Sequence, residues 1–70
     1  MGEMNDKRAE WASYAVRRFS EITGSELFEE AIMDLLCDLR HLCDRECVDW
    51  YDVLDSAMNL HYREEKELDE

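Results

Sequence analysis

The chain contains no proline and only two glycines, Gly2 and Gly24, among its 70 residues. Proline and glycine usually mark the turns between short strands, so their scarcity argues against a β-sheet protein and favours long helices. No apolar run approaches the ~18 residues that a membrane-spanning helix needs. A chain of this length is enough for one domain, and we expect residues 1–70 to form a single all-α domain.

Cysteine is also scarce: Cys37, Cys43 and Cys47 are the only three. Small secreted domains held together by disulfides usually carry an even number of cysteines. The segment from Met1 to Glu10 is polar and charged, unlike a secretory signal. We therefore expect free thiols and a cytoplasmic location.

Basic residues are few, since 8 Lys and Arg face 19 Asp and Glu and leave a net charge of −11. Residues 1–24 are neutral overall, so residues 25–70 carry the whole excess. Nucleic acids and anionic membranes bind positive surfaces, and we expect neither as a direct partner. A protein with a basic surface is electrostatically more plausible.

Apolar residues recur at helical spacing in three segments, which predicts helices over about 5–22, 24–46 and 49–65. The middle helix should be central, because its apolar residues spread over nearly half of its circumference. Residues 1–4 and 66–70 are expected to fray. The predicted core faces of the outer helices are Met4, Trp11, Ala15, Phe19 and Ile22 in the first, and Trp50, Val53, Leu54, Ala57 and His61 in the third.

The helix junctions contain recognisable capping residues. Asn5 and Asp49 are the expected N-caps of the first and third helices. Two interpretations fit the first junction. Thr23 forms a capping box with Glu26, or Gly24 is the left-handed residue that ends the first helix and Ser25 caps the second.

A candidate acidic surface consists of Glu26, Glu30, Asp34, Asp38, Asp52 and Asp55. The first four recur every fourth residue and should line one side of the second helix. Carboxylates at such spacing can hold Mg²⁺, as in the all-α nucleotide pyrophosphatases that the pattern faintly resembles. This part of the chain lacks a compact group of basic residues that could bind phosphate, so a solvated charged face is the simpler interpretation. Imitation of nucleic-acid charge is a further alternative.

The cysteines and histidines do not suggest a metal site. Cys37 with His41, and Cys43 with Cys47, form two pairs with a spacing of four. On one helix these pairs point to nearly opposite sides and cannot converge on one zinc ion. Because no nucleophile motif or phosphate loop is present either, we expect no enzyme, no cofactor and no metal.

A candidate interaction surface consists of Tyr14, Tyr51, Tyr62, Met33 and Met58, which lie outside the predicted core faces. Aromatic residues and methionine are typical of protein contacts. The leading hypothesis is therefore a small protein–protein interaction module, with a homodimer left open. The alternatives are a nucleic-acid-mimicking inhibitor of a host DNA- or RNA-binding defence protein, and a Mg²⁺-dependent nucleotide pyrophosphatase-like enzyme.

The chain resembles a group of short, uncharacterised acidic helical proteins of proteobacterial phages and integrated mobile elements. The residues that carry the resemblance are Trp11, Phe19, Thr23-Gly24, the segment from Asp34 to Leu39, and His61-Tyr62. The resemblance implies an origin in a phage or mobile element and assigns no functional residues.

Overall fold

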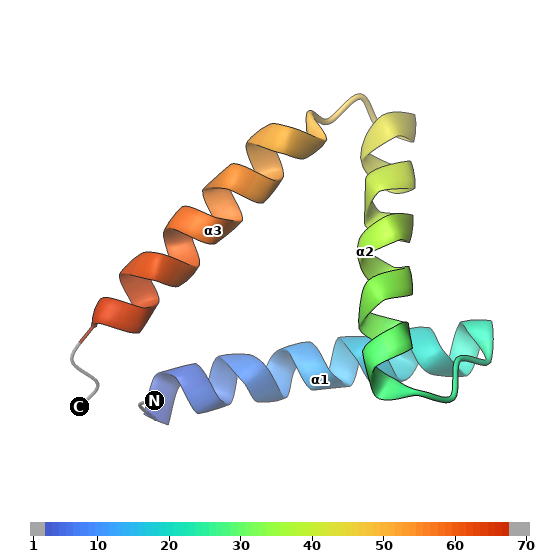
Figure 1. Ribbon diagram of the computed structural model, residues 1–70, viewed down its shortest axis with the longest axis horizontal. Coiled ribbons are helices and arrows are strands. Elements are labelled where there is room, and N and C mark those ends of the chain that lie inside the picture. The colour runs from blue at the N-terminus through green and yellow to red at the C-terminus, as the bar shows by residue number, and fades with distance from the viewer. Residues whose placement is uncertain (1–2, 68–70) are drawn as a thin grey trace.

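The computed structural model describes residues 3–67, which form three α-helices: α1 (Glu3–Thr23), α2 (Phe28–Arg45) and α3 (Trp50–Lys66) (Figure 1). This confirms the prediction of an all-α, three-helix domain. The helices are the sides of an open triangle. α2 crosses α1 and α3 returns toward the start of α1 (Figure 1).

The first junction follows the second of its two interpretations for Gly24 but not for Ser25. Gly24 adopts a φ of 81°, and its N–H donates to the carbonyl of Ser20 at 2.7 Å. This is the left-handed end of a helix, for which glycine is favoured because it has no Cβ. α2 begins only at Phe28, with Leu27 at the N-cap and no side-chain cap bond. The predicted start at residue 24 is therefore four residues early.

Neither Thr23 nor Ser25 caps α2, so both predicted caps are wrong. The Thr23 hydroxyl instead donates to the carbonyl of Phe19 at 3.0 Å, within α1. The Ser25 hydroxyl donates to the Asp34 carboxylate at 3.3 Å and so ties the connection to the side of α2. Both hydroxyls are thus engaged away from the free N–H groups of the first turn of α2.

α2 ends at Arg45 in a Schellman motif. The N–H of Val48 donates to the carbonyl of Cys43 at 2.9 Å, and the N–H of Cys47 donates to that of Asp44 at 3.4 Å. Cys47 occupies the left-handed position of this motif, with a φ of 60°. A residue with a Cβ is disfavoured in that conformation, so the end of α2 is strained at this residue.

The predicted cap of α3 is confirmed, because the Asp49 carboxylate accepts the N–H of Asp52 at 3.0 Å. The predicted cap of α1 is wrong: the helix begins at Glu3, and Asn5 lies inside it. Of the ends predicted to fray, Met4 and Lys66 are helical here, while residues 1–2 and 68–70 lie outside the described part of the chain.

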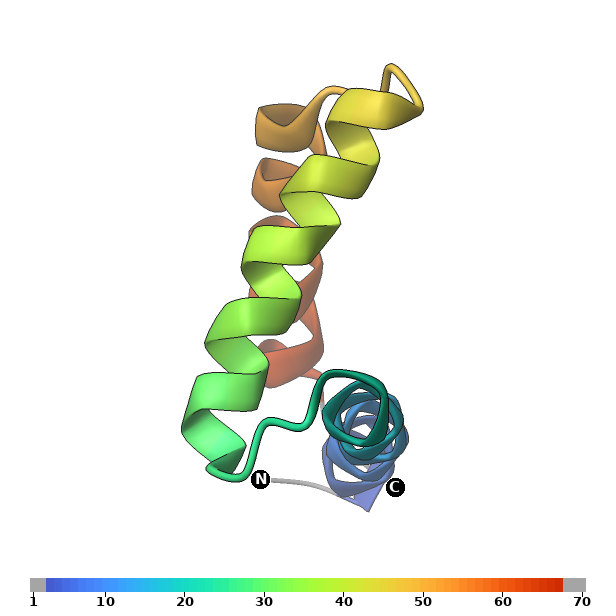
Figure 2. The same cartoon turned by 90° about the vertical axis from the view of Figure 1, so that its right-hand side faces the viewer.

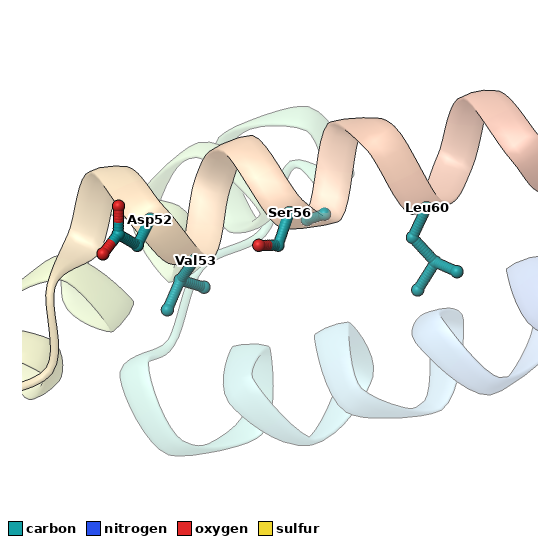
Figure 3. Close-up of a pocket in the computed structure, with 5 residues that line it drawn as sticks. Asp52, Val53, Ser56 and Leu60 are labelled. Carbon is teal, nitrogen blue, oxygen red and sulfur yellow. The ribbon is translucent and has the colours of Figure 1, made fainter.

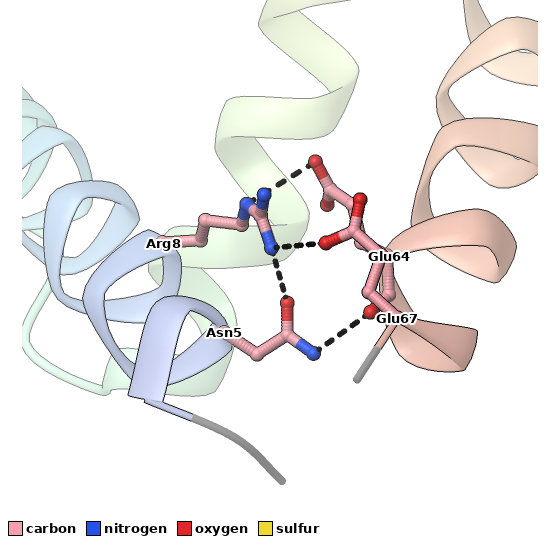
Figure 4. Close-up of polar contacts among 4 residues, drawn as sticks. All are labelled: Asn5, Arg8, Glu64 and Glu67. Atoms are coloured by element: carbon pink, nitrogen blue, oxygen red, sulfur yellow. Dashed lines mark hydrogen bonds and ion pairs between the residues drawn. The ribbon is translucent and has the colours of Figure 1, made fainter. Parts of the chain in front are cut away.

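Asn5 instead helps to close the triangle, at the corner where α1 meets the end of α3 (Figure 4). Its amide donates to the carbonyl of Glu64 at 3.2 Å, and its oxygen accepts from the guanidinium of Arg8 at 2.7 Å. Arg8 also forms ion pairs with Glu64 at 3.2 Å and with Glu67 at 3.5 Å. A polar cluster therefore joins the first and last helices at this corner.

α2 packs against both α1 and α3, which confirms that it is the central helix. In the end-on view, α2 passes along one side of α1 near the connection between them (Figure 2). Val16 and Ala31 are the only buried residues among those described, with 6% and 0% of their surface exposed. The apolar interior is thus confined to one residue on each of the two packed helices.

The core faces predicted for the outer helices are largely exposed, so that part of the prediction is wrong. α1 buries Val16, which is about 140° around the helix from Trp11 and about 120° from Ile22. Trp11 remains 55% exposed. On α3, Val53 and Leu54 are also exposed, and Trp50 is half-buried. The apolar spacing identified helix faces correctly as apolar, but the single chain does not cover them.

The molecule is flat and expanded. Its extents are 37 × 29 × 15 Å, so the shortest dimension is less than half of the longest. The radius of gyration is 13.9 Å, against ~11 Å expected for a compact chain of this length. α2 lies beside α1 where the two cross, but the three helices do not enclose a common core (Figure 2).

We expect Cys47→Gly to raise the free energy of unfolding and Gly24→Ala to lower it, each by about 1 kcal/mol. Cys47→Gly removes the strain of a non-glycine residue in the left-handed conformation. Gly24→Ala places a non-glycine residue in that conformation, at a site where no atom lies within 4 Å of the added Cβ. Urea denaturation at one fixed protein concentration measures both effects. Cys37→Ala, at an exposed position inside α2, is the control and should change little. A less stable Cys47→Gly variant would contradict this account.

We expect Arg8→Ala to loosen the corner between α1 and α3 and to cost about 1 kcal/mol or less, since the ion pairs are partly exposed. Faster amide hydrogen exchange in the last turn of α3 is the direct measurement. The control is Arg18→Ala, because Arg18 pairs with Glu21 of the same helix and is well exposed. Equal exchange in the two variants would show that the corner does not hold α3.

Candidate interaction surface

The acidic residues of α2 lie on one exposed side of the helix. Glu30, Asp34 and Asp38 are all exposed and follow one another at intervals of four residues, about 6 Å along the axis. Glu26 lies in the connection before α2, so the predicted stripe loses its first member. The spacing correctly predicted that Glu30, Asp34 and Asp38 share one side of α2. Glu26 is not part of that side because the helix begins only at Phe28.

The opposite side of α2 is apolar. Phe28, Ile32, Leu36, Leu39 and Leu42 are all exposed. Together with Ala31, Leu35 and Cys43 they fill an arc of about 140° that contains no charged residue between positions 28 and 43. We call this arc the apolar face of α2. It is separated from the acidic residues, so the two surfaces can act independently.

α3 turns a second apolar surface toward the opening of the triangle. Val53, Ser56 and Leu60 project from α3 on the side facing α1 (Figure 3). With Asp52 and Ala57 they line a shallow hollow. Its apolar walls are open to solvent, and Val53 and Leu60 are both exposed. Within one chain, α1 does not fill this hollow.

The other side of α3 carries Tyr51, Met58 and Tyr62, which we call the tyrosine stripe. Spacings of seven and four residues keep these side chains within about 40° of one another, and roughly opposite Val53 and Leu60. They are 65%, 58% and 61% exposed. Three of the five residues of the predicted interaction surface therefore share one face of one helix.

The two tyrosine rings of this stripe form cation–π contacts with basic side chains. Arg40 of α2 lies over the ring of Tyr51, 5.0 Å from its centroid, and donates to the phenol oxygen at 3.1 Å. That hydrogen bond is the main cause that raises the pKa of the Arg40 guanidinium. Lys66 lies 5.2 Å from the centroid of the Tyr62 ring. No helical periodicity pairs Arg40 with Tyr51, so sequence analysis could not find this contact between helices.

The remaining members of the predicted interaction surface lie elsewhere. Tyr14 is on α1, where the guanidinium of Arg17 lies 5.7 Å from its ring centroid. Met33 is on α2 and lines a surface hollow whose other walls include Phe28, Ile32 and Leu36. The structure therefore divides the predicted surface among three helices. Asp55, of the acidic set, lies beside the tyrosine stripe, about 40° around α3 from Tyr51.

Nothing in the described structure adds support for metal-dependent chemistry. Among residues 3–67, no three His, Cys, Asp or Glu side chains are grouped so that they could hold a metal ion. Cys37 and Cys47 are exposed free thiols, and Cys43 is a half-buried one. The pyrophosphatase hypothesis stays an untested prediction.

None of the helices that the structure describes has the length and apolar character needed to cross a membrane. Comparison of the chain with protein-family models, curated proteins and solved structures gave no match. The function is therefore inferred from the acidic side of α2, the apolar face of α2 and the tyrosine stripe of α3.

Proposed function

We propose that this protein is a small protein–protein interaction module. The observation that supports the proposal is the exposure of its apolar residues. The large apolar side chains identified as exposed have 37% to 68% of their surface in contact with solvent. Folded monomers rarely leave large apolar patches uncovered, and such patches usually mark contacts with other proteins.

For contact with a different protein, the tyrosine stripe is the best candidate. Tyrosine, methionine and arginine are enriched in interfaces, where a tyrosine ring buries a large area and its hydroxyl still forms a hydrogen bond. Arg40 and Lys66 hold the rings of Tyr51 and Tyr62, which reduces the side-chain entropy lost on binding. The stripe thus presents a partly ordered aromatic surface.

The chemistry around the stripe favours a partner with a basic surface. Asp55 lies at its edge, and residues 25–70 carry the whole negative excess of the chain. Opposite charge speeds association and selects among partners. A cytoplasmic location and an origin in a phage or mobile element complete the proposal, on the basis of the sequence alone.

We expect the double variant Tyr51→Ser/Tyr62→Ser to lose its partner. The loss of affinity should be about tenfold or more, because exposed aromatic anchors contribute strongly to binding. Quantitative affinity capture from cells that express the protein measures this, with circular dichroism to verify the fold. Tyr14→Ser, on α1, is the matched control and should retain the partner. If the wild-type protein, the double variant and Tyr14→Ser all retained the partner equally, the tyrosine stripe would be ruled out as the binding surface.

A second candidate function is imitation of nucleic-acid charge toward a DNA- or RNA-binding protein. Within residues 3–67, the six residues of the candidate acidic surface form no ion pair with lysine or arginine; Asp34 only accepts a hydrogen bond from Ser25. Unpaired carboxylates on an exposed face keep their full attraction for a basic groove. This supports mimicry as an alternative use of the acidic side of α2.

Mimicry makes a prediction about salt that contact through the stripe does not. Affinity for the partner should fall at least about tenfold between ~50 and ~200 mM salt. Asp34→Asn/Asp38→Asn should weaken binding and flatten this dependence. The control Glu21→Gln/Glu46→Gln removes the same charge from exposed positions off the acidic side of α2. Isothermal titration at several salt concentrations distinguishes the variants, and indistinguishable salt slopes would exclude the acidic side.

A further inference from the structure

We propose that a second copy of this chain covers the apolar face of α2, so that the folded unit is a symmetric homodimer. The inference rests on the proposed function, because it identifies one partner of the interaction module. It leaves the tyrosine stripe, on the far side of α3, for a different protein.

The exposed area is the first argument. The chain exposes 5985 Å². A folded monomer of 8.4 kDa is expected to expose about 4,600 Å². The surplus is therefore about 1,400 Å² per chain, or roughly 2,800 Å² for two copies, and stable homodimers bury about 2,000–5,000 Å². The uncovered area matches what a second copy would bury.

The open arrangement of the helices also favours a second copy. Helical domains enclose a core between packed layers, and the contact of α2 with α1 buries only Val16 and Ala31. Two copies related by a two-fold axis would supply the layer that covers the remaining apolar surface. In such a pair each copy contributes the same surface, so the surface must be self-complementary.

The distribution of charge makes this self-complementarity feasible. Two chains of net charge −11 repel one another, so they join most readily where few carboxylates are presented. The apolar face of α2 is uncharged and is bordered by Glu29 and Asp38, and its centre is about 130° around the helix from the centre of the side formed by Glu30, Asp34 and Asp38. Packing through the apolar faces therefore leaves these carboxylates in water.

The small interior of the single chain favours a copy over any other occupant. Val16 and Ala31 are the only buried residues among those described, so the apolar interior of one chain offsets little of the conformational entropy lost by ordering three helices. Association would supply the missing burial and would couple folding to binding. A second copy is present wherever the chain is made.

The test is sedimentation equilibrium of the full chain, with melting temperature measured over a range of protein concentrations. We expect twice the 8.4 kDa chain mass, and a melting temperature that rises with concentration. Added salt should tighten the dimer, because it screens the repulsion between the chains. A folded monomer with a concentration-independent melting temperature, or an open series of larger oligomers, would overturn the proposal.

A matched pair of variants locates the interface. Leu39→Glu places a carboxylate in the apolar face of α2 and should abolish the dimer, leaving an unfolded or much less stable monomer. His41→Glu introduces the same side chain two residues later, about 160° around the helix, and should remain a dimer. A Leu39→Glu variant that stays dimeric would show that this face is not the interface.

The two proposals fail in different ways. A stable monomer whose partner binding still depends on Tyr51 and Tyr62 would refute the homodimer and leave the proposed function intact. A homodimer whose binding to other proteins is unaffected by those substitutions would refute the role of the stripe. The salt response also separates them, because salt strengthens association of two acidic chains and weakens association with a basic partner.

Discussion

The packing of α2 on α1 is the interaction on which the rest of the structure depends. It buries Val16 and Ala31 and fixes the direction in which α2 leaves α1. Because α2 crosses α1 and does not lie along it, α3 can return to α1 only at the far corner. The Arg8 cluster closes that corner with polar contacts. A triangle with three joined corners and little apolar interior is the result.

That geometry gives the helices faces with different roles. α2 has an acidic side and an apolar face, and α3 has an apolar side and a tyrosine stripe. The centres of the two surfaces on each helix are more than a quarter turn apart, so one surface can be covered while most of the other stays in water. A homodimer core, an aromatic contact for another protein and an acidic exterior are therefore compatible within 70 residues.

Some elements could be predicted from sequence because their causes are local. Asp49 caps α3 through the N–H of a residue three positions away, and Gly24 ends α1 through its own backbone conformation. The start of α2 could not be predicted in this way. Both Thr23 and Ser25 are suitable caps, but their hydroxyls bond to Phe19 and Asp34 instead. Contacts between helices, such as Arg40 with Tyr51, leave no periodic signal in one chain.

The sequence by itself determined that this protein has three helices, which faces of them are apolar, and that its negative charge belongs to residues 25–70. These properties follow from local backbone preference and from the order of residues along each helix. Only the tertiary structure decided that most of the apolar surface stays uncovered. The helical spacing of apolar residues indicates that one face of a helix is suited to burial. It does not indicate whether that face is covered by the same chain or by another protein.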